Sequence, residues 1–426
     1  MSISETGLQS LPPATMYRQN ALSILLFLCT AFAFLLRFSV SPQLLNLVVH
    51  YTSVGGAFIE KLHFGTYAIF LLLPLALFSR KIVLRGDEIG TFKALLLYSA
   101  LMAVLVPYLF SVGRASSSGF IIDTYVAAGA AGLLMLAQDS GSRRALGNVV
   151  LVMLIVSAAI GIVEAVTKHR LLLYNLDELQ FRPIGLAAHP LALGAFSATA
   201  IGFVMLTHWR IWVRLAAAFI LLIGVAASGA RFALLMAGVE VLLLLLFVRW
   251  PQLSRRQELR AKFVAFIFAV VTGAALVVVL LAGGLLSRFN GSIFDENFFA
   301  RVTIYRVFEF VSWKQIIFGM NDKDLLDIVH EKLHLPYIES TPVVLILLFG
   351  LPVALLFIVL VFWMLLRLLR HAPLQAWIAT ITFLLAALSN NALSSKTPEM
   401  TMIVVLLIAF SSQAKQAERP PSTVPD

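Results

Sequence analysis

Four arginines are the residues of this chain whose type and position most clearly suggest chemistry. Arg182 stands in Phe-Arg-Pro-Ile-Gly, Arg231 follows Ala-Ser-Gly-Ala, and Arg301 and Arg306 share a long polar segment later in the chain. A guanidinium group presents forked donors that match the oxygens of a phosphate or a diphosphate. All four are therefore candidates for binding a substrate diphosphate, and contact with lipid headgroups is the alternative for each.

Two carboxylates are candidates for proton transfer. Glu339 precedes Ser340, where the polar segment gives way to an apolar run, and a carboxylate in that place can accept a proton from a substrate hydroxyl. Its other interpretation is an acid that the dipole of the following helix stabilises. Glu240 lies in the middle of an apolar run, where an ionisable group usually has a partner or a function. We expect a structural partner for Glu240, with a proton relay as the alternative.

The segment His330-Glu-Lys-Leu-His334 has the spacing that places two imidazoles on one helical face for zinc, with the glutamate as the base. A lysine lies inside this motif, Pro336 ends the helix, and no third ligand follows in a downstream helix. We expect a solvated helical face rather than a metalloprotease site. His330 and His334 remain alternative bases, and neither a metal nor another cofactor is expected.

The composition indicates which elements position these residues. Hydrophobic residues make up 60% of the chain and charged residues 13%, well below the roughly one-quarter that is charged in soluble domains. Apolar runs approach the ~20 residues that a spanning helix needs. The expected fold class is an all-α polytopic membrane protein with about 12 transmembrane helices, at residues 21–40, 64–78, 94–110, 120–136, 146–166, 190–207, 211–227, 232–248, 263–286, 341–366, 374–388 and 401–410.

Basic residues cluster in alternate connections, such as Arg143 with Arg144 and Arg367 with Arg370. Such connections face the cytoplasm, so both termini are predicted to be cytoplasmic. These topology determinants account for the net charge of +10, and no nucleic-acid partner is expected. The predicted organisation is a cytoplasmic N-terminus at 1–20, helices 1 to 9 at 21–286, a long periplasmic loop between helices 9 and 10 at 287–340, helices 10 to 12 at 341–412, and a disordered cytoplasmic tail at 413–426.

The long loop is predicted to contain two amphipathic helices. Four residues at helical spacing indicate a first helix that ends by Gly319, namely Phe298, Val302, Tyr305 and Phe308. A second helix over 323–335 would place the two histidines on one face. Such helices lie on the membrane surface or cap a helix bundle.

The order of these signals resembles the O-antigen ligase and Wzy polymerase superfamily of bacterial polysaccharide assembly. The resemblance covers most of the chain from Arg182 onward. It rests on Arg182-Pro-Ile-Gly185, on Ser228-Gly-Ala-Arg231, on Arg301-Val-Thr-Ile-Tyr305 leading into Ile317-Phe-Gly319-Met-Asn321, and on the piece from Glu339-Ser340 to Gly350. In the ligase branch the last piece begins with His-Asn, whereas Glu339-Ser340 stands there in this chain. This departure favours a polymerase.

The resemblance implies a GT-C-like glycosyltransferase in the bacterial inner membrane. Such an enzyme uses an undecaprenyl-diphosphate-linked oligosaccharide as donor, inverts the anomeric centre without a metal, and as a polymerase takes another lipid-linked repeat unit as acceptor. Glu339 and Arg231 are then the catalytic candidates, with Arg182, Arg301 and Arg306 on the diphosphate. Membrane lipids and other polysaccharide export and chain-length proteins are expected partners. The alternatives are an O-antigen ligase that transfers to lipid A core and a lipid-linked glycan flippase.

Overall fold

The computed structural model describes residues 13–53, 55–79, 82–84, 86–174, 181–249, 254–282, 296–335, 338 and 340–410. This part of the chain is all-helical and none of it forms a β-strand. In order, its elements are α1 (Pro13–Ser39), α2 (Pro42–Leu45), η1 (Phe58–Lys61), α3 (Phe64–Ser79), α4 (Asp87–Ser111), η2 (Ala115–Ser117), α5 (Ser118–Phe120), η3 (Ile121–Val126), α6 (Ala127–Leu136), α7 (Ser140–Thr167), α8 (Pro190–Val204), α9 (Ile211–Ala227), α10 (Arg231–Phe247), α11 (Arg255–Ala282), α12 (Glu296–Thr303), η5 (Ile304–Glu309), α13 (Trp313–Phe318), α14 (Asp322–Leu333), α15 (Thr341–Phe349), α16 (Leu351–Leu369), α17 (Leu374–Leu388), η6 (Ala392–Ser394) and α18 (Glu399–Phe410).

Several of the described helices suit a membrane. Five are long and apolar enough to cross one, namely Asn20–Ser39, Asp87–Ser111, Ala115–Leu136, Ser140–Thr167 and Leu351–Leu369. Shorter apolar helices are α3, α8, α9, α17 and α18. Over their described residues, all but one of the predicted spans coincide with a helix or with an unbroken helical run, because long apolar stretches satisfy their backbone hydrogen bonds internally as helices. Residues 283–286 of the ninth predicted span, the start of the predicted N-terminal segment (1–12), the start of the predicted long loop (287–295) and the predicted tail (413–426) lie outside the described residues. The number of membrane crossings remains a prediction.

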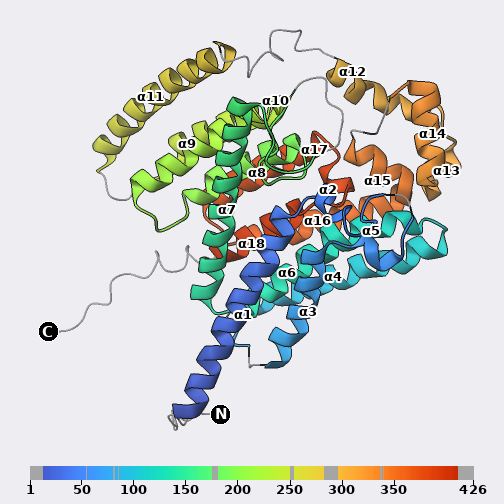
Figure 1. Cartoon of the computed structure of the whole chain (residues 1–426), viewed down its shortest axis with the longest axis horizontal. Helices are drawn as coiled ribbons and strands as arrows, with labels where there is room; N and C mark the ends of the chain where they lie inside the picture. Colours follow the sequence, from blue (N-terminus) through green and yellow to red (C-terminus); the bar gives the residue numbers. More distant parts are fainter. Residues whose placement is uncertain are drawn as a thin grey trace.

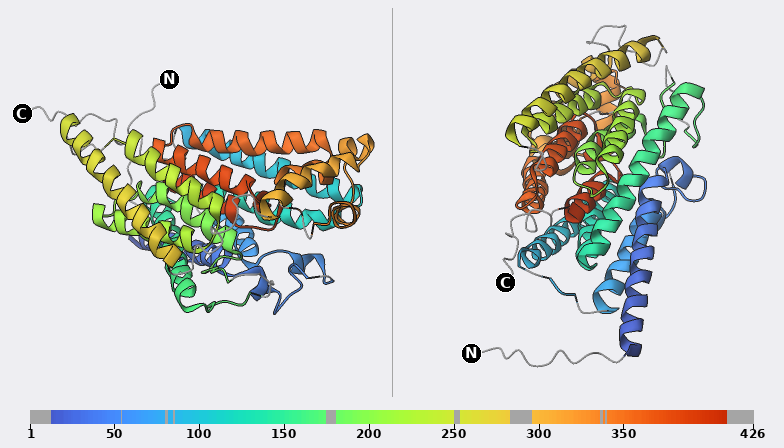
Figure 2. Two further views of the ribbon diagram at one scale, coloured as in Figure 1. Left: turned by 90° about the horizontal axis from the view of Figure 1, so that it is seen from above. Right: turned by 90° about the vertical axis from the view of Figure 1, so that its left-hand side faces the viewer.

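The helices pack into a bundle in which α3, α4, α6 and α18 lie together and α8, α9, α10 and α17 form a second group (Figure 1). Helix α7 packs against members of both groups, and α11 lies at the edge beside α10 and α9 (Figures 1 and 2). Helices α12, α13 and α14 gather at one end of the bundle, which we call the loop end. The first turns of α1 and the last of α18 lie toward the opposite, terminal end (Figures 1 and 2).

The predicted span at 341–366 is wrong as a single helix, because the chain breaks at Gly350 between α15 and α16. Gly350 has φ +84° and Gly319 has φ +77°, values that glycine adopts without the strain that a Cβ atom brings. A Cβ on Gly319 would lie 2.8 Å from the backbone nitrogen of Gly350, and a Cβ on Gly350 would meet the carbonyl of Ile317. These two glycines therefore allow the loop to lie directly against the break.

The first predicted loop helix is also wrong in its extent and its buried face. The chain forms α12, the 3₁₀ helix η5 and α13 in place of one helix. Val302 and Tyr305, predicted to be on the apolar face, are 56% and 51% exposed, whereas Ile304 and Val307 are buried. A 3₁₀ turn has three residues per turn, so it rotates the following side chains away from the register of an α-helix.

Cysteine labelling can test the predicted orientation. With Cys29 replaced, we expect an impermeant thiol reagent to modify a cysteine at Asp322 in intact spheroplasts and to leave one at Gln257 unmodified, because basic connections stay in the cytoplasm. The two positions lie in α14 at the loop end and in the first turns of α11. Modification of the second but not the first would mean that the orientation is inverted.

Candidate functional site

Two of the predicted arginines lie at the turn that precedes α10. Arg182 is buried, and its Nε donates a hydrogen bond to the carbonyl of Ser228 at 3.1 Å. Ser228 begins the short turn, with Gly229 at φ +66°, that leads into the first residue of α10, Arg231. Arg231 is half-buried. A hydrogen bond thus joins two segments that the sequence motifs marked, with Arg182 and Ser228 lying 46 residues apart in the chain.

Glu164, near the end of α7, organises the loop that carries Arg182. Its carboxylate accepts hydrogen bonds from the backbone nitrogens of Leu171, Ile184 and Gly185, each at 2.8 Å. The side chain is buried, so these charge-assisted bonds form away from bulk water. Glu164 therefore fixes the backbone on both sides of Arg182.

Arg170 is a third cation at this place, and sequence reasoning did not single it out. Its Nε donates to the carbonyl of Arg182 at 3.0 Å, and its guanidinium lies over the ring of Tyr174, 4.2 Å from the centroid. Burial of His189, together with the positive charges of Arg182 and Arg170, lowers the pKa of its ring to about 4. The Nδ1 atom of His189 accepts from the backbone nitrogen of Leu191, so the neutral ring caps α8. We call Arg170, Arg182 and Arg231 the arginine group.

A second contact joins the loop helices to the start of α15. The hydroxyl of Ser340 donates to that of Tyr305 at 3.3 Å, which brings the Arg301–Tyr305 piece to the Glu339–Ser340 piece. Glu339 itself lies outside the described residues, and so does the side chain of Arg301. Ser340 is buried, so the position next to Glu339 is enclosed by protein.

Arg306 does not join the arginine group. It is exposed and pairs with Glu309 at 3.4 Å, three residues later in η5. A surface ion pair of this kind contributes little to stability, because water screens both charges. The predicted diphosphate role of Arg306 has no support from this placement.

The loop is fastened to the bundle at the Gly350 break. The backbone nitrogen of Met320 donates to the carbonyl of Leu347 at 2.7 Å. Arg114, from the turn after α4, donates from Nη1 to the carbonyls of Phe318 and Leu348 at 2.8 and 2.9 Å. Carbonyls at the end of α15 are thus satisfied by the loop and by a buried arginine.

The zinc spacing at His330 and His334 does not correspond to one helical face. Helix α14 ends at Leu333, and His334 adopts a left-handed conformation with φ +55°. Both histidines are exposed. Among the described residues, no three His, Cys, Asp or Glu side chains converge as metal ligands would. The helix over 323–335 is therefore two residues shorter than predicted at its end.

In η3, a buried polar cluster that the sequence did not reveal surrounds Asp123. Its carboxylate accepts from the hydroxyl of Tyr51 at 2.9 Å and from the backbone nitrogen of His63 at 3.1 Å, and its carbonyl accepts from Arg37. Lys396 donates to the carbonyl of Tyr51 at 2.8 Å. Burial, reinforced by Arg37, lowers the pKa of His63 to about 3, so that ring stays neutral. These contacts hold the segment between α1 and α3, which contains Tyr51 and His63, against the bundle.

Glu240, in α10, is enclosed between α8 and α17. A Cβ on Gly202 would lie 2.5 Å from its Oε1 atom and 2.8 Å from the Cβ of Ala379. No cation among the described residues pairs with this carboxyl group, and its polar neighbours are the side chain of Thr382 and the backbone of Gly202. An unpaired charge is costly to bury, which favours a neutral carboxyl group at a packing seam.

We expect Glu164→Gln to loosen the Arg182 loop, because the substitution replaces one acceptor oxygen by a donor that faces backbone N–H groups. Losing a hydrogen bond to a charged group should lower the free energy of unfolding by about 1.5–3 kcal/mol. Thermal unfolding in detergent measures this effect. Glu309→Gln, which removes an exposed carboxylate, is the control and should change stability by less than about 0.5 kcal/mol. Equal stability of the two variants would contradict the role of Glu164.

Comparison with known proteins found no family whose model matches this chain and no curated protein that matches it.

Proposed function

We propose that this protein is a membrane glycosyltransferase that polymerises lipid-linked glycan repeat units at the loop end of the bundle. The observation that supports this most directly is the arginine group, in which Arg182 is buried against the turn that precedes Arg231. Guanidinium groups in a partly desolvated site attract a diphosphate more strongly than they would in bulk water, because less water screens the opposite charges.

The reaction assigns a role to each group. The oxygen of an acceptor hydroxyl attacks the anomeric carbon of the donor, the bond from that carbon to the diphosphate oxygen breaks, and the configuration inverts. The diphosphate leaves with the bonding electrons, and the arginine group stabilises its growing negative charge. The hydroxyl proton passes to Glu339. No step requires a metal.

Lipid-anchored substrates need apolar surface beside the reacting groups. A narrow crevice of about 70 Å³ lies between α15, α16 and α17, with Thr341, Leu345, Phe357 and Leu388 among its lining residues. It begins one residue after Ser340. Apolar surface of this kind beside the start of α15 suits a lipid-anchored substrate, and positioning of two tethered substrates would supply much of the rate enhancement.

The lipid-linked glycan profile of cells that lack the protein tests this proposal. A polymerase defect leaves single lipid-linked repeat units, and that is the expected result. Finished but unligated polymer would indicate a ligase, and the absence of outward-facing glycan would indicate a flippase. Purified protein given defined lipid-linked repeats should form polymer without any other enzyme.

A further inference from the structure

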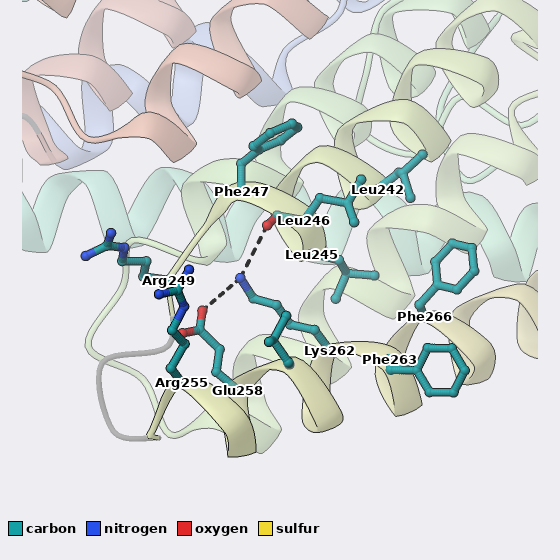
Figure 3. Close-up of a pocket in the computed structure, with 11 residues that line it drawn as sticks. Leu242, Leu245, Leu246, Phe247, Arg249, Arg255, Glu258, Lys262, Phe263 and Phe266 are labelled. Carbon is teal, nitrogen blue, oxygen red and sulfur yellow. Dashed lines mark hydrogen bonds and ion pairs between the residues drawn. The ribbon is translucent and has the colours of Figure 1, made fainter.

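A large groove between α10 and α11 lies away from the arginine group. It has a volume of about 1220 Å³. Its walls are Leu242, Leu245 and Leu246 from α10 and Leu259, Phe263 and Phe266 from α11 (Figure 3). Since α10 begins at the arginine group, this groove, near the other end of α10, lies toward the terminal end of the bundle. The diphosphate of a lipid bound to Arg182 and Arg231 would therefore lie at the opposite end of α10 from this groove.

The rim of the groove is cationic. Arg249 and Arg255 line it and are exposed, and neither forms an ion pair with a described residue. Lys262 donates from Nζ to the carbonyl of Leu246 at 3.3 Å and pairs with Glu258 at 2.8 Å (Figure 3). Lys262 therefore neutralises the charge of Glu258 at this rim. The same lysine also links α11 to the last turn of α10 through the carbonyl of Leu246.

We propose that this groove binds an anionic phospholipid, with its acyl chains along the leucines and phenylalanines and its phosphate between Arg249 and Arg255. The apolar walls match hydrocarbon, and the two arginines supply the forked donors that a phosphate accepts. Basic clefts between transmembrane helices bind anionic headgroups by this combination. A zwitterionic lipid carries its own cation, so it gains less from this rim. The inference stands independently of glycan transfer.

The arrangement of α11 provides a matched control. Residues 255, 259, 262, 263 and 266 line the groove at helical spacing. Arg256 and Arg260 are exposed and are not in the lining, and because their positions are four residues apart they share one other face of α11. Arg249→Gln with Arg255→Gln and Arg256→Gln with Arg260→Gln remove the same charge from the same end of the bundle, but only the first pair removes it from the groove.

Full-length protein purified in mild detergent should retain phosphatidylglycerol, measured per protein by mass spectrometry. Each arginine near a membrane surface raises affinity for anionic lipid roughly five-fold, so the groove pair should lose at least five-fold of the retained lipid. The control pair should stay within two-fold of the parent. Equal losses in both pairs, or no loss in the groove pair, would overturn the proposal.

A second variant tests the apolar part of the site. Leu242→Trp adds bulk to the groove wall without changing charge, and Leu242 is itself 38% exposed, so folding is expected to persist. Delipidated protein titrated with phosphatidylglycerol should gain thermal stability, phosphatidylcholine should give a smaller gain, and Leu242→Trp should weaken the first effect. An equal response to both lipids would overturn the anionic specificity.

Discussion

Glu339→Gln should reduce polymer formation by about two to four orders of magnitude while protein level stays unchanged. Glutamine keeps the shape of the side chain but cannot accept the proton of the acceptor hydroxyl at neutral pH. Ser340, the next residue, is buried and hydrogen-bonded to Tyr305 at the place where the loop meets α15. Purified protein with defined lipid-linked repeats gives the rate directly.

The histidines of the loop offer the contrasting result. His330→Ala with His334→Ala should reduce activity less than Glu339→Gln, because both side chains are exposed and His334 lies beyond the end of α14. A chelator should leave activity intact, since the proposed mechanism requires no metal. Full activity in Glu339→Gln, with none in the double histidine variant, would transfer the role of the base to the histidines and leave the arginine roles standing.

Arg231→Lys should lose most of the activity, about 10- to 100-fold, although it keeps the positive charge. A compact ammonium group cannot form the forked pair of hydrogen bonds that a guanidinium makes to a diphosphate, and one hydrogen bond to a charged group contributes about 1.5–3 kcal/mol. Arg231 opens α10 directly after the turn that Arg182 contacts. The loss should appear in kcat/KM for the lipid-linked donor, measured at equal protein level.

Arg306→Lys is the matched control for this substitution. Arg306 is exposed and pairs with Glu309 in its own helix, so the same chemical change there should leave activity within about two-fold. Near-normal polymer from Arg231→Lys would show that Arg231 contributes only charge or structure. A large loss of activity in Arg306→Lys would instead indicate that η5 is part of the substrate site.

The pieces that carry the family resemblance meet in pairs in the folded chain. The Arg182 piece contacts the Ser228 piece through a hydrogen bond, the Tyr305 piece contacts Ser340, and Gly319 packs on Gly350. Each pair joins segments that are separate in sequence. This convergence is a reason to test the pieces as parts of one site.

The sequence by itself determined the all-helical fold and the approximate place of nearly every helix. Helical hydrogen bonds are local and apolar runs are long, so hydropathy is sufficient to locate them. Residue type and motif were also sufficient to select Arg182 and Arg231 as candidate anion ligands. The break at Gly350 and the 3₁₀ turn at η5 were not predicted, because an apolar run continues through the first and a helical period through the second.

Only the tertiary structure decided which charged residues share a site. Arg170 belongs to the arginine group because it donates a hydrogen bond to the carbonyl of Arg182. Arg306 instead lies at the surface, where it pairs with Glu309. Asp123 and Arg37, 86 residues apart, gave no sign in the sequence that they would meet. Local patterns report the conformation of neighbouring residues, but the partner of a buried charge is set by which helices pack side by side, and that depends on contacts between residues far apart in the chain.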